Sequence, residues 1–241
     1  MASVRKNQAR LSRKQWQAFV DAIDAIRRKG AAKPTYDDFV DVHAKAMSDR
    51  FMGRWQVHTM TMPGGMLMRG RNFLAWHRWF LLEFEERLKQ HDPTVTVPYW
   101  DWGSDPKIPP RINRPELLKR WRVRRDWTPS EMPDRAEARA VMRKDTFEVF
   151  QRRLETIHGF VHIAVGGTKG QMSGARSPAD PIFWLHHANI DRLWDRWEHK
   201  HPGKRPKNSN EKLKPASMRG IEFGIKVSEI LKASNLGYRY R

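Results

Sequence analysis

The sequence predicts a mostly α-helical protein: a single-domain helical bundle with long loops and little β structure. Apolar residues recur at the three- and four-residue spacing of buried helix faces. Proline and glycine gather in the segments between them, where they favour turns. The 241 residues include 11 Trp and 11 Phe, which supply large side chains for one core. We therefore assign residues 1–241 to one domain.

Two helices are expected near the N-terminus. Ser12 and Gln15 form a capping box, which predicts a first helix that runs to about Lys29 and is stopped by the glycine after it. A second helix should begin near Thr35 and carry His43.

The middle of the chain combines one long helix with two irregular segments. Residues 48–70 are rich in Met and Gly and are expected to form a loop that contains His58. The helix that follows, to about residue 91, carries His77 at the edge of its apolar face. That face consists of Phe73, Trp76, Phe80, Phe84 and Leu88. Residues 93–102 are expected to be extended.

Two further long helices are expected in the second half. Residues 106–133 are Pro-rich and should be mostly loop with one short helix. Asp145 can cap the helix that bears His158 and His162. The helix after it should have Asp180 as N-cap, Pro181 as its first residue and an end near His199.

Histidine spacing on these last two helices is typical of a metal site. His158 and His162 lie four residues apart, so both can hold one ion from the same helix face. His187 can supply a third imidazole. Asp191 follows one turn later, where a carboxylate can orient a ligating imidazole or neighbouring backbone. His186 points about 100° away from His187 and is expected to pack or to support a ligand.

A second group of histidines lies upstream and consists of His43, His58 and His77. The chain has no Cys, which excludes zinc sites built on thiolates. Coordination by imidazoles alone suits copper, zinc, nickel or iron. The sequence therefore predicts a bundle with two groups of metal ligands pointing into its centre.

Two longer segments carry a specific resemblance. FLAWHRWFLLEFE (residues 73–85) and DPIFWLHHANID (residues 180–191) resemble the two copper signatures of the tyrosinase family of type-3 copper proteins, which includes tyrosinases, catechol oxidases and haemocyanins. Shorter similarities are HGFVHIAVGG (158–167), PYWDW (98–102), VRKN (4–7) and LGYRY (236–240). The resemblance therefore extends over nearly the whole chain.

The resemblance implies a bacterial-type catalytic core with a central dicopper site and dioxygen as co-substrate. The implied ligands are His43, His58 and His77 for the first copper and His158, His162 and His187 for the second. The implied activity is oxidation of o-diphenols, and ortho-hydroxylation of monophenols, to o-quinones. An o-aminophenol oxidase, a haemocyanin-like oxygen binder without turnover and a polycationic binding protein with vestigial histidines remain alternatives.

The second ligand of the first copper departs from the family pattern. Family members usually place it nine residues before the histidine of FLAWHR, and here that position is Met68. His58 lies nineteen residues before His77, so either the ligand loop is expanded or the site is altered. The loop contains Met60, Met62, Met66 and Met68. A thioether suits Cu(I), but methionine also serves as adaptable packing or as a lid.

The resemblance also suggests residues that act on the substrate. Gly159 stands where several bacterial tyrosinases carry an Asn, which with an upstream Glu holds a water proposed to deprotonate the phenol. Glu155 is the candidate for that catalytic Glu, with Glu148 as the alternative. Further candidates for substrate contact are Phe183 beside the coppers, and Ile163 and Ala175 as pocket walls.

The formal net charge of +19 by itself would suggest a nucleic-acid binder. The basic segments 111–125 and 199–214 accompany no nucleic-acid motif, so we interpret both as surface and expect no dedicated nucleic-acid site. A cationic rim could still attract carboxylated phenols or acidic polymers. No membrane span or secretory signal is recognisable, which favours a cytoplasmic protein. The resemblance implies a phenolic small-molecule substrate. The sequence does not identify a copper-delivery partner.

Overall fold

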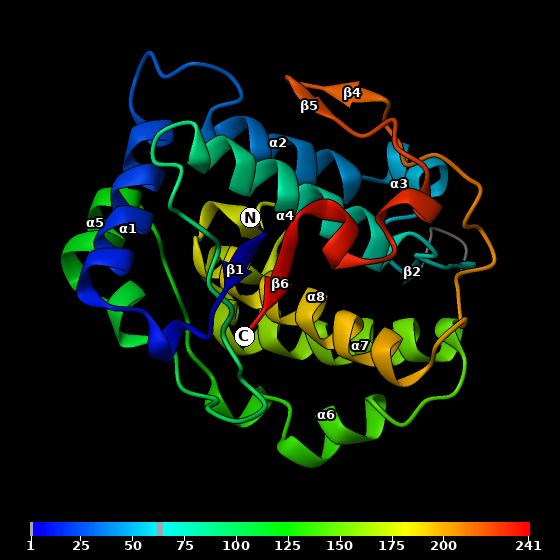
Figure 1. Cartoon of the computed structure of the whole chain (residues 1–241). Helices are drawn as coiled ribbons and strands as arrows, with labels where there is room; N and C mark the ends of the chain where they lie inside the picture. Colours follow the sequence, from blue (N-terminus) through cyan, green and yellow to red (C-terminus); the bar gives the residue numbers. More distant parts are fainter. Residues whose placement is uncertain (1, 62–64) are drawn as a thin grey trace.

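Four helices pack around the centre of the molecule in the computed structural model, which describes residues 2–61 and 65–241 (Figure 1). They are α2 (Tyr36–Ala46), α4 (Phe73–Lys89), α7 (Phe147–Gly166) and α8 (Ile182–Lys200). Helix α4 contacts both α7 and α8, and α1 (Arg13–Arg27) covers α4 from outside. The predicted helical bundle is confirmed.

The predicted starts of the first two helices are confirmed. The side chain of Ser12 accepts a hydrogen bond from the backbone of Gln15, and the Gln15 side chain returns one to Ser12. Thr35 and Asp38 form the same kind of box before α2. These bonds satisfy backbone N–H groups that have no partner inside a helix.

The starts of the last two long helices differ slightly from expectation. Asp180 does accept a hydrogen bond from Ile182 N, but the helix begins at Ile182, after Pro181. The carboxylate of Asp180 also binds the guanidinium of Arg125, so the side chain of this basic residue is buried rather than on the surface, and Ile112, Leu117, Trp121 and Val123 of the segment 111–125 are buried as well. Asp145 was wrongly predicted as a cap, because the N-cap of α7 is Thr146.

Short elements complete the fold. The expected loop 48–70 contains helix α3 (Asp49–Trp55) and a small hairpin of β2 (Met60–Thr61) and β3 (Leu67–Met68), while Met62 and Gly64 lie outside the described residues. The other short α-helices are α5 (Pro115–Trp121) and α6 (Arg135–Val141). Single 3-10 turns occupy Gln8–Arg10, Pro110–Ile112, Pro129–Glu131, Gln171–Ser173, Ser177–Ala179, Val227–Ile230 and Ala233–Leu236.

The two ends of the chain lie side by side (Figure 1). Strand β1 (Ser3–Arg5) pairs in parallel with β6 (Tyr238–Tyr240), so that Arg5 stands opposite Tyr240. A second hairpin joins β4 (Ser217–Met218) to β5 (Ile221–Glu222). The predicted extended segment 93–102 makes one bridge, between Tyr99 and Asn7, and is otherwise irregular.

Large aromatic side chains fill the space between the long helices. Phe84 and Trp184 stack with ring centroids 3.6 Å apart and join α4 to α8. Phe39 of α2 packs edge-on against Phe84 and Trp184. Because such rings bury much apolar area each, they enclose the centre of the bundle in a water-poor environment.

Candidate metal centre

Two groups of histidines meet in that centre. In the first group, one ring nitrogen each from His43 (α2), His58 (before β2) and His77 (α4) lies within 4.8 Å of the others. The second group meets the same criterion and consists of His158 and His162 (α7) with His186 and His187 (α8). All seven side chains are buried except that of His162, which is half-buried.

Three ring nitrogens converge in the second group. The Nε2 of His187 lies 3.2 Å from the Nε2 of His158 and 3.4 Å from that of His162. Two nitrogens bound to one tetrahedral ion at about 2.0–2.1 Å would be roughly 3.3 Å apart. The spacing therefore fits three ligands of one metal ion.

The other ring nitrogen shows which atom is free to coordinate. The Nδ1 atoms of His43, His77 and His162 lie 2.8, 2.8 and 2.6 Å from backbone carbonyl oxygens of Ala175, Phe73 and Met172. A carbonyl oxygen only accepts hydrogen bonds, so each Nδ1 carries the proton and each Nε2 keeps a lone pair. Carbonyl partners of this kind orient ligating histidines in metal sites.

His186 has the opposite arrangement. The indole Nε1 of Trp102 donates a hydrogen bond to Nδ1 of His186 at 3.1 Å. An accepting Nδ1 requires the proton of the neutral ring to be on Nε2, which then has no lone pair for a metal. His186 thus belongs to the group in space, but its protonation leaves three imidazoles able to bind there. Trp102 is the last residue of the PYWDW segment, so this segment contacts the second histidine group through His186.

Burial keeps these imidazoles neutral. It lowers the pKa of His43 to about 3 and that of His162 to about 4, and it lowers the pKa of His58, His77 and His187 well below the usual range. Neutral imidazole is the form that binds metals. The Nε2 atoms of His43, His58 and His77 are buried with no hydrogen-bond partner among the described residues, as expected of nitrogens reserved for a metal.

The two groups adjoin each other. The rings of His77 and His187 stack with centroids 4.3 Å apart and planes 16° apart. The ring of Phe183 lies between the groups, with its centroid 5.0 Å from that of the His43 ring and 4.1 Å from that of the His187 ring. Two ions held here would therefore be close enough to act on one small molecule.

The candidate substrate residues lie along α7 and near its end. Gly159 is half-buried, and a Cβ added to it would meet nothing within 4 Å. Ile163 is 47% exposed. Ala175 is exposed, and the contact that it makes with the site is through its carbonyl oxygen, on His43.

Glu155 lies beside the first group. Its Oε1 is 3.9 Å from Nδ1 of His58, and both carboxylate oxygens accept hydrogen bonds from Thr59. Burial raises the pKa of Glu155 to about 7, although the Thr59 hydrogen bonds oppose the rise. The alternative, Glu148, is exposed and accepts a hydrogen bond from Lys207 N.

The predicted role of Asp191 was wrong. Its carboxylate accepts hydrogen bonds from Arg5, Arg78 and the hydroxyls of Tyr238 and Tyr240, so it binds the two chain ends to α4 rather than an imidazole. The Nδ1 of His187 has no partner among the described residues. The histidine spacing gave no signal for this ion cluster, although the end segments VRKN and LGYRY contain its other members.

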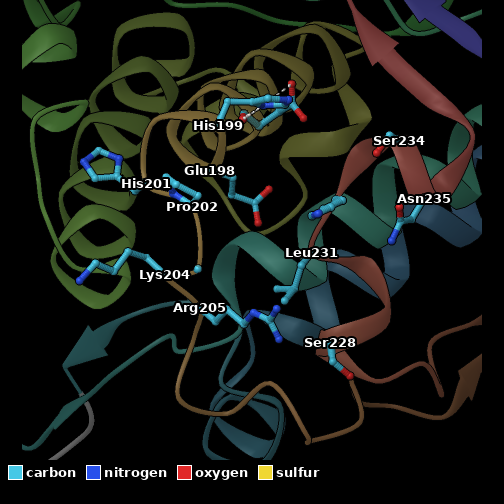
Figure 2. Close-up of a pocket in the computed structure, with 13 residues that line it drawn as sticks. Glu198, His199, His201, Pro202, Lys204, Arg205, Ser228, Leu231, Ser234 and Asn235 are labelled. Carbon is cyan, nitrogen blue, oxygen red and sulfur yellow. Dashed lines mark hydrogen bonds and ion pairs between the residues drawn. The ribbon is translucent and has the colours of Figure 1, made fainter.

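A polar pocket of about 580 Å³ lies elsewhere, at the C-terminal end of α8 (Figure 2). Glu198, His201 and Arg205 are among its lining residues, and none of the grouped histidines is. Glu198 also contacts Arg78 at 3.3 Å, and burial raises its pKa to about 7. The pocket thus borders the ion cluster rather than the metal centre.

The sequence that contains these histidines is similar to that of known proteins. A sequence model of the tyrosinase family, described as the common central domain of tyrosinase, matches residues 33–128 and 110–200. Tyrosinases of Streptomyces glaucescens and Streptomyces antibioticus are 33% and 34% identical to the chain, covering 83% of it and 84% of their own length. The chain belongs to the tyrosinase family. As a member it is a copper-dependent oxidoreductase with a binuclear copper site that uses dioxygen.

Solved structures agree on the fold. A functional unit of octopus hemocyanin superposes with a TM-score of 0.78 at 20% identity, covering 99% of this chain and 68% of that one. A polyphenol oxidase of Thermothelomyces thermophila gives 0.70 at 17% identity, covering 100% and 89%. Since a hemocyanin unit and a polyphenol oxidase share the fold, the fold by itself does not identify the reaction. No helix in the described part of the chain is long and apolar enough to span a membrane.

Proposed function

We propose that this protein is a phenol oxidase that converts o-diphenols, and with lower efficiency monophenols, into o-quinones. The observation that carries the proposal is the meeting of two buried sets of three imidazoles with free Nε2 lone pairs. We assign His43, His58 and His77 to one copper and His158, His162 and His187 to the other. The copper pair supplies the activation of dioxygen; the protein supplies geometry and a dry environment.

The side chains around the coppers define how a phenol would reach them. Among the six proposed ligands only His162 is half-buried, so we propose that substrate enters on that side, past Gly159 and Ile163. Phe183 offers an aromatic edge next to both sets of ligands, against which a phenol ring can pack. The net charge of +19 would favour phenols that carry a carboxylate. A cytoplasmic location remains a prediction.

One comparison of substrates tests the assignment. Copper-loaded protein is given a monophenol, the matching catechol and an o-aminophenol under the same conditions. Fast catechol oxidation supports the proposal, while preference for the o-aminophenol would make that class the substrate. Reversible oxygen binding without catechol turnover would identify an oxygen carrier.

Copper content is the first expected result. The protein should bind two coppers per chain, measured by elemental analysis, and the reduced form should gain an absorption band on exposure to dioxygen. Two sets of three neutral nitrogen ligands account for this number. A single tightly bound ion, or full activity with zinc alone, would contradict the assignment.

Gly159→Asn is expected to raise the rate ratio of monophenol to diphenol oxidation. An Asn amide there could hold a water that accepts the phenol proton, and such general-base assistance contributes about 10² or more in rate. The added side chain has room, because a Cβ at Gly159 meets nothing within 4 Å. Gly159→Ala is the matched control and should keep the original ratio. An unchanged or lower ratio in the Asn variant would show that the position does not support a water in this chain.

A further inference from the structure

Helix α7 holds the residue that follows His58. Glu155 Oε1 accepts a hydrogen bond from Thr59 N at 2.6 Å, and its Oε2 accepts one from the Thr59 hydroxyl at 2.8 Å. The carboxylate therefore binds both the backbone and the side chain of the position next to the proposed copper ligand.

Thr59 also closes the chain on itself. Its hydroxyl donates to Glu155 and accepts a hydrogen bond from Gly70 N at 2.9 Å. A Cβ at Gly70 would lie only 2.5 Å from the carbonyl carbon of His58, so the two backbones touch and only glycine fits. The chain thus leaves this place at Thr59 and returns to it at Gly70, and we call these two bonded residues the stem. Strands β2 and β3 follow and precede the stem and pair with each other.

A second side chain of α7 binds the chain that follows this stem. Gln151, one turn before Glu155, donates through Nε2 to the carbonyl oxygens of Gly70 and Arg71 at 3.3 and 3.2 Å. Its Oε1 accepts a hydrogen bond from Leu74 N at 3.2 Å, in the first turn of the helix that carries His77. Helix α7 carries two proposed ligands of the second copper. Through Glu155 and Gln151 it also holds the segments that carry His58 and His77, two proposed ligands of the first copper.

The ring of His58 has no hydrogen bond of its own among the described residues, so its orientation depends on these backbone contacts. Its Nδ1 lies 3.9 Å from Glu155 Oε1, which is beyond hydrogen-bond distance, whereas His43, His77 and His162 are each oriented by a carbonyl oxygen. The direction of the His58 ring is thus set by the backbone on either side of it.

We propose that Glu155 is a positioning residue that fixes the Thr59–Gly70 stem and thereby aims Nε2 of His58 at the first copper, while residues 60–69 are dispensable for copper binding. The proposal rests on His58 being a ligand. It assigns Glu155 a different role from the catalytic one suggested by the family resemblance, because both carboxylate oxygens already accept hydrogen bonds from Thr59.

Thr59→Val and Thr59→Ser form the decisive pair. Valine keeps the shape of threonine but removes the hydroxyl. We expect it to weaken the binding of the first copper 10- to 100-fold, which is about the effect of removing a supporting contact from a metal ligand. The second copper should keep its affinity. Chelator competition measures both affinities, and electron paramagnetic resonance should detect an isolated Cu(II) in partly loaded protein. Serine keeps a hydroxyl at this position and should keep the affinity for the first copper.

Glu155→Gln should reproduce the defect of Thr59→Val, and the double variant should be no worse than the more affected single one, because both changes break one network. Glu148→Gln is the control, since that carboxylate is exposed on the same helix and contacts Lys207 N. Replacing residues 60–69 by an Asn-Gly turn should leave both copper affinities within threefold of the original.

A metal-free measurement separates this proposal from the proposed function. In copper-free Glu155→Gln, the amide protons of Thr59 and Gly70 should exchange at least tenfold faster than in the original protein. If the protein bound no copper, the proposed function would fail while this result could still stand. Equal copper affinities in the Val and Ser variants would overturn the proposal. So would a Glu155→Gln variant with unchanged exchange and copper affinity that loses only monophenol hydroxylation.

Discussion

His58→Ala is expected to lose one copper and nearly all oxidase activity, whereas Met68→Leu should keep both coppers and at least a tenth of the rate. A ring nitrogen of His58 lies within 4.8 Å of those of His43 and His77. Met68 instead lies in β3, with Met60 opposite it in the hairpin. A thioether would also be a poor substitute for imidazole on Cu(II). A tenfold loss of rate corresponds to about 1.4 kcal/mol in barrier.

The measurements are copper per chain and kcat on a catechol, made on both variants side by side. A Met68→Leu protein that loses copper, together with an active His58→Ala protein, would reverse the assignment of the two residues. It would also remove the basis for treating residues 60–69 as dispensable.

The second copper offers a matched pair on adjacent residues. His187→Ala should lose that copper and all turnover, because its Nε2 meets those of His158 and His162. His186→Ala should keep both coppers and substantial activity, because the Trp102 N–H commits Nδ1 of His186 and leaves its proton on Nε2. Equal losses in the two variants would show that the tautomer of His186 differs from this reading.

The helices that carry the histidines were predictable because their signals are local. Capping boxes at Ser12 and Thr35 and the helical spacing of apolar residues each lie within a few positions. Helix α3 was missed because seven residues carry too little periodicity to distinguish a helix from a loop. The N-cap of α7 was misplaced by one residue, which is common where two polar residues precede a helix.

The contacts that prepare the site could not be predicted, because they join residues far apart in the chain. The carbonyl oxygens that orient His43 and His162 belong to Ala175 and Met172, and nothing in either local sequence marks them. The hydrogen bonds from Thr59 to Glu155 span 96 positions. Spacing shows which face of a helix a residue occupies but not which group it meets there. Asp191 was misassigned for this reason.

Asp191→Asn is expected to lower the free energy of unfolding by about 3 kcal/mol or more, the usual effect of removing one partner from a buried ion pair. The carboxylate binds two buried guanidinium groups, those of Arg5 and Arg78, and the hydroxyls of Tyr238 and Tyr240. Asparagine keeps the size but leaves both cations without this counter-charge. Urea denaturation of the copper-free protein measures the loss without interference from metal binding.

The pH dependence of that difference identifies the charge as its cause. Burial alone would raise the pKa of Asp191, but the attraction of Arg78 and Arg5 and the tyrosine hydrogen bonds outweigh it and lower the pKa. A lowered pKa gives stability that is complete above the unfolded value of about 3.9 and is lost as the pH falls through the folded value. The difference in the free energy of unfolding between the original protein and Asp191→Asn should therefore stay constant near neutral pH and become smaller only in strong acid.

Asp195→Asn provides the control one turn later on α8. Burial raises the pKa of Asp195, so its charged form is disfavoured in the folded protein and the amide should cost little. The contrast between two aspartates on one helix separates the carboxylate paired with two arginines from a half-buried one without such a pair. A loss of under 1 kcal/mol in Asp191→Asn, or an equal loss in Asp195→Asn, would show that the ion cluster does not hold the chain ends against the two ligand helices.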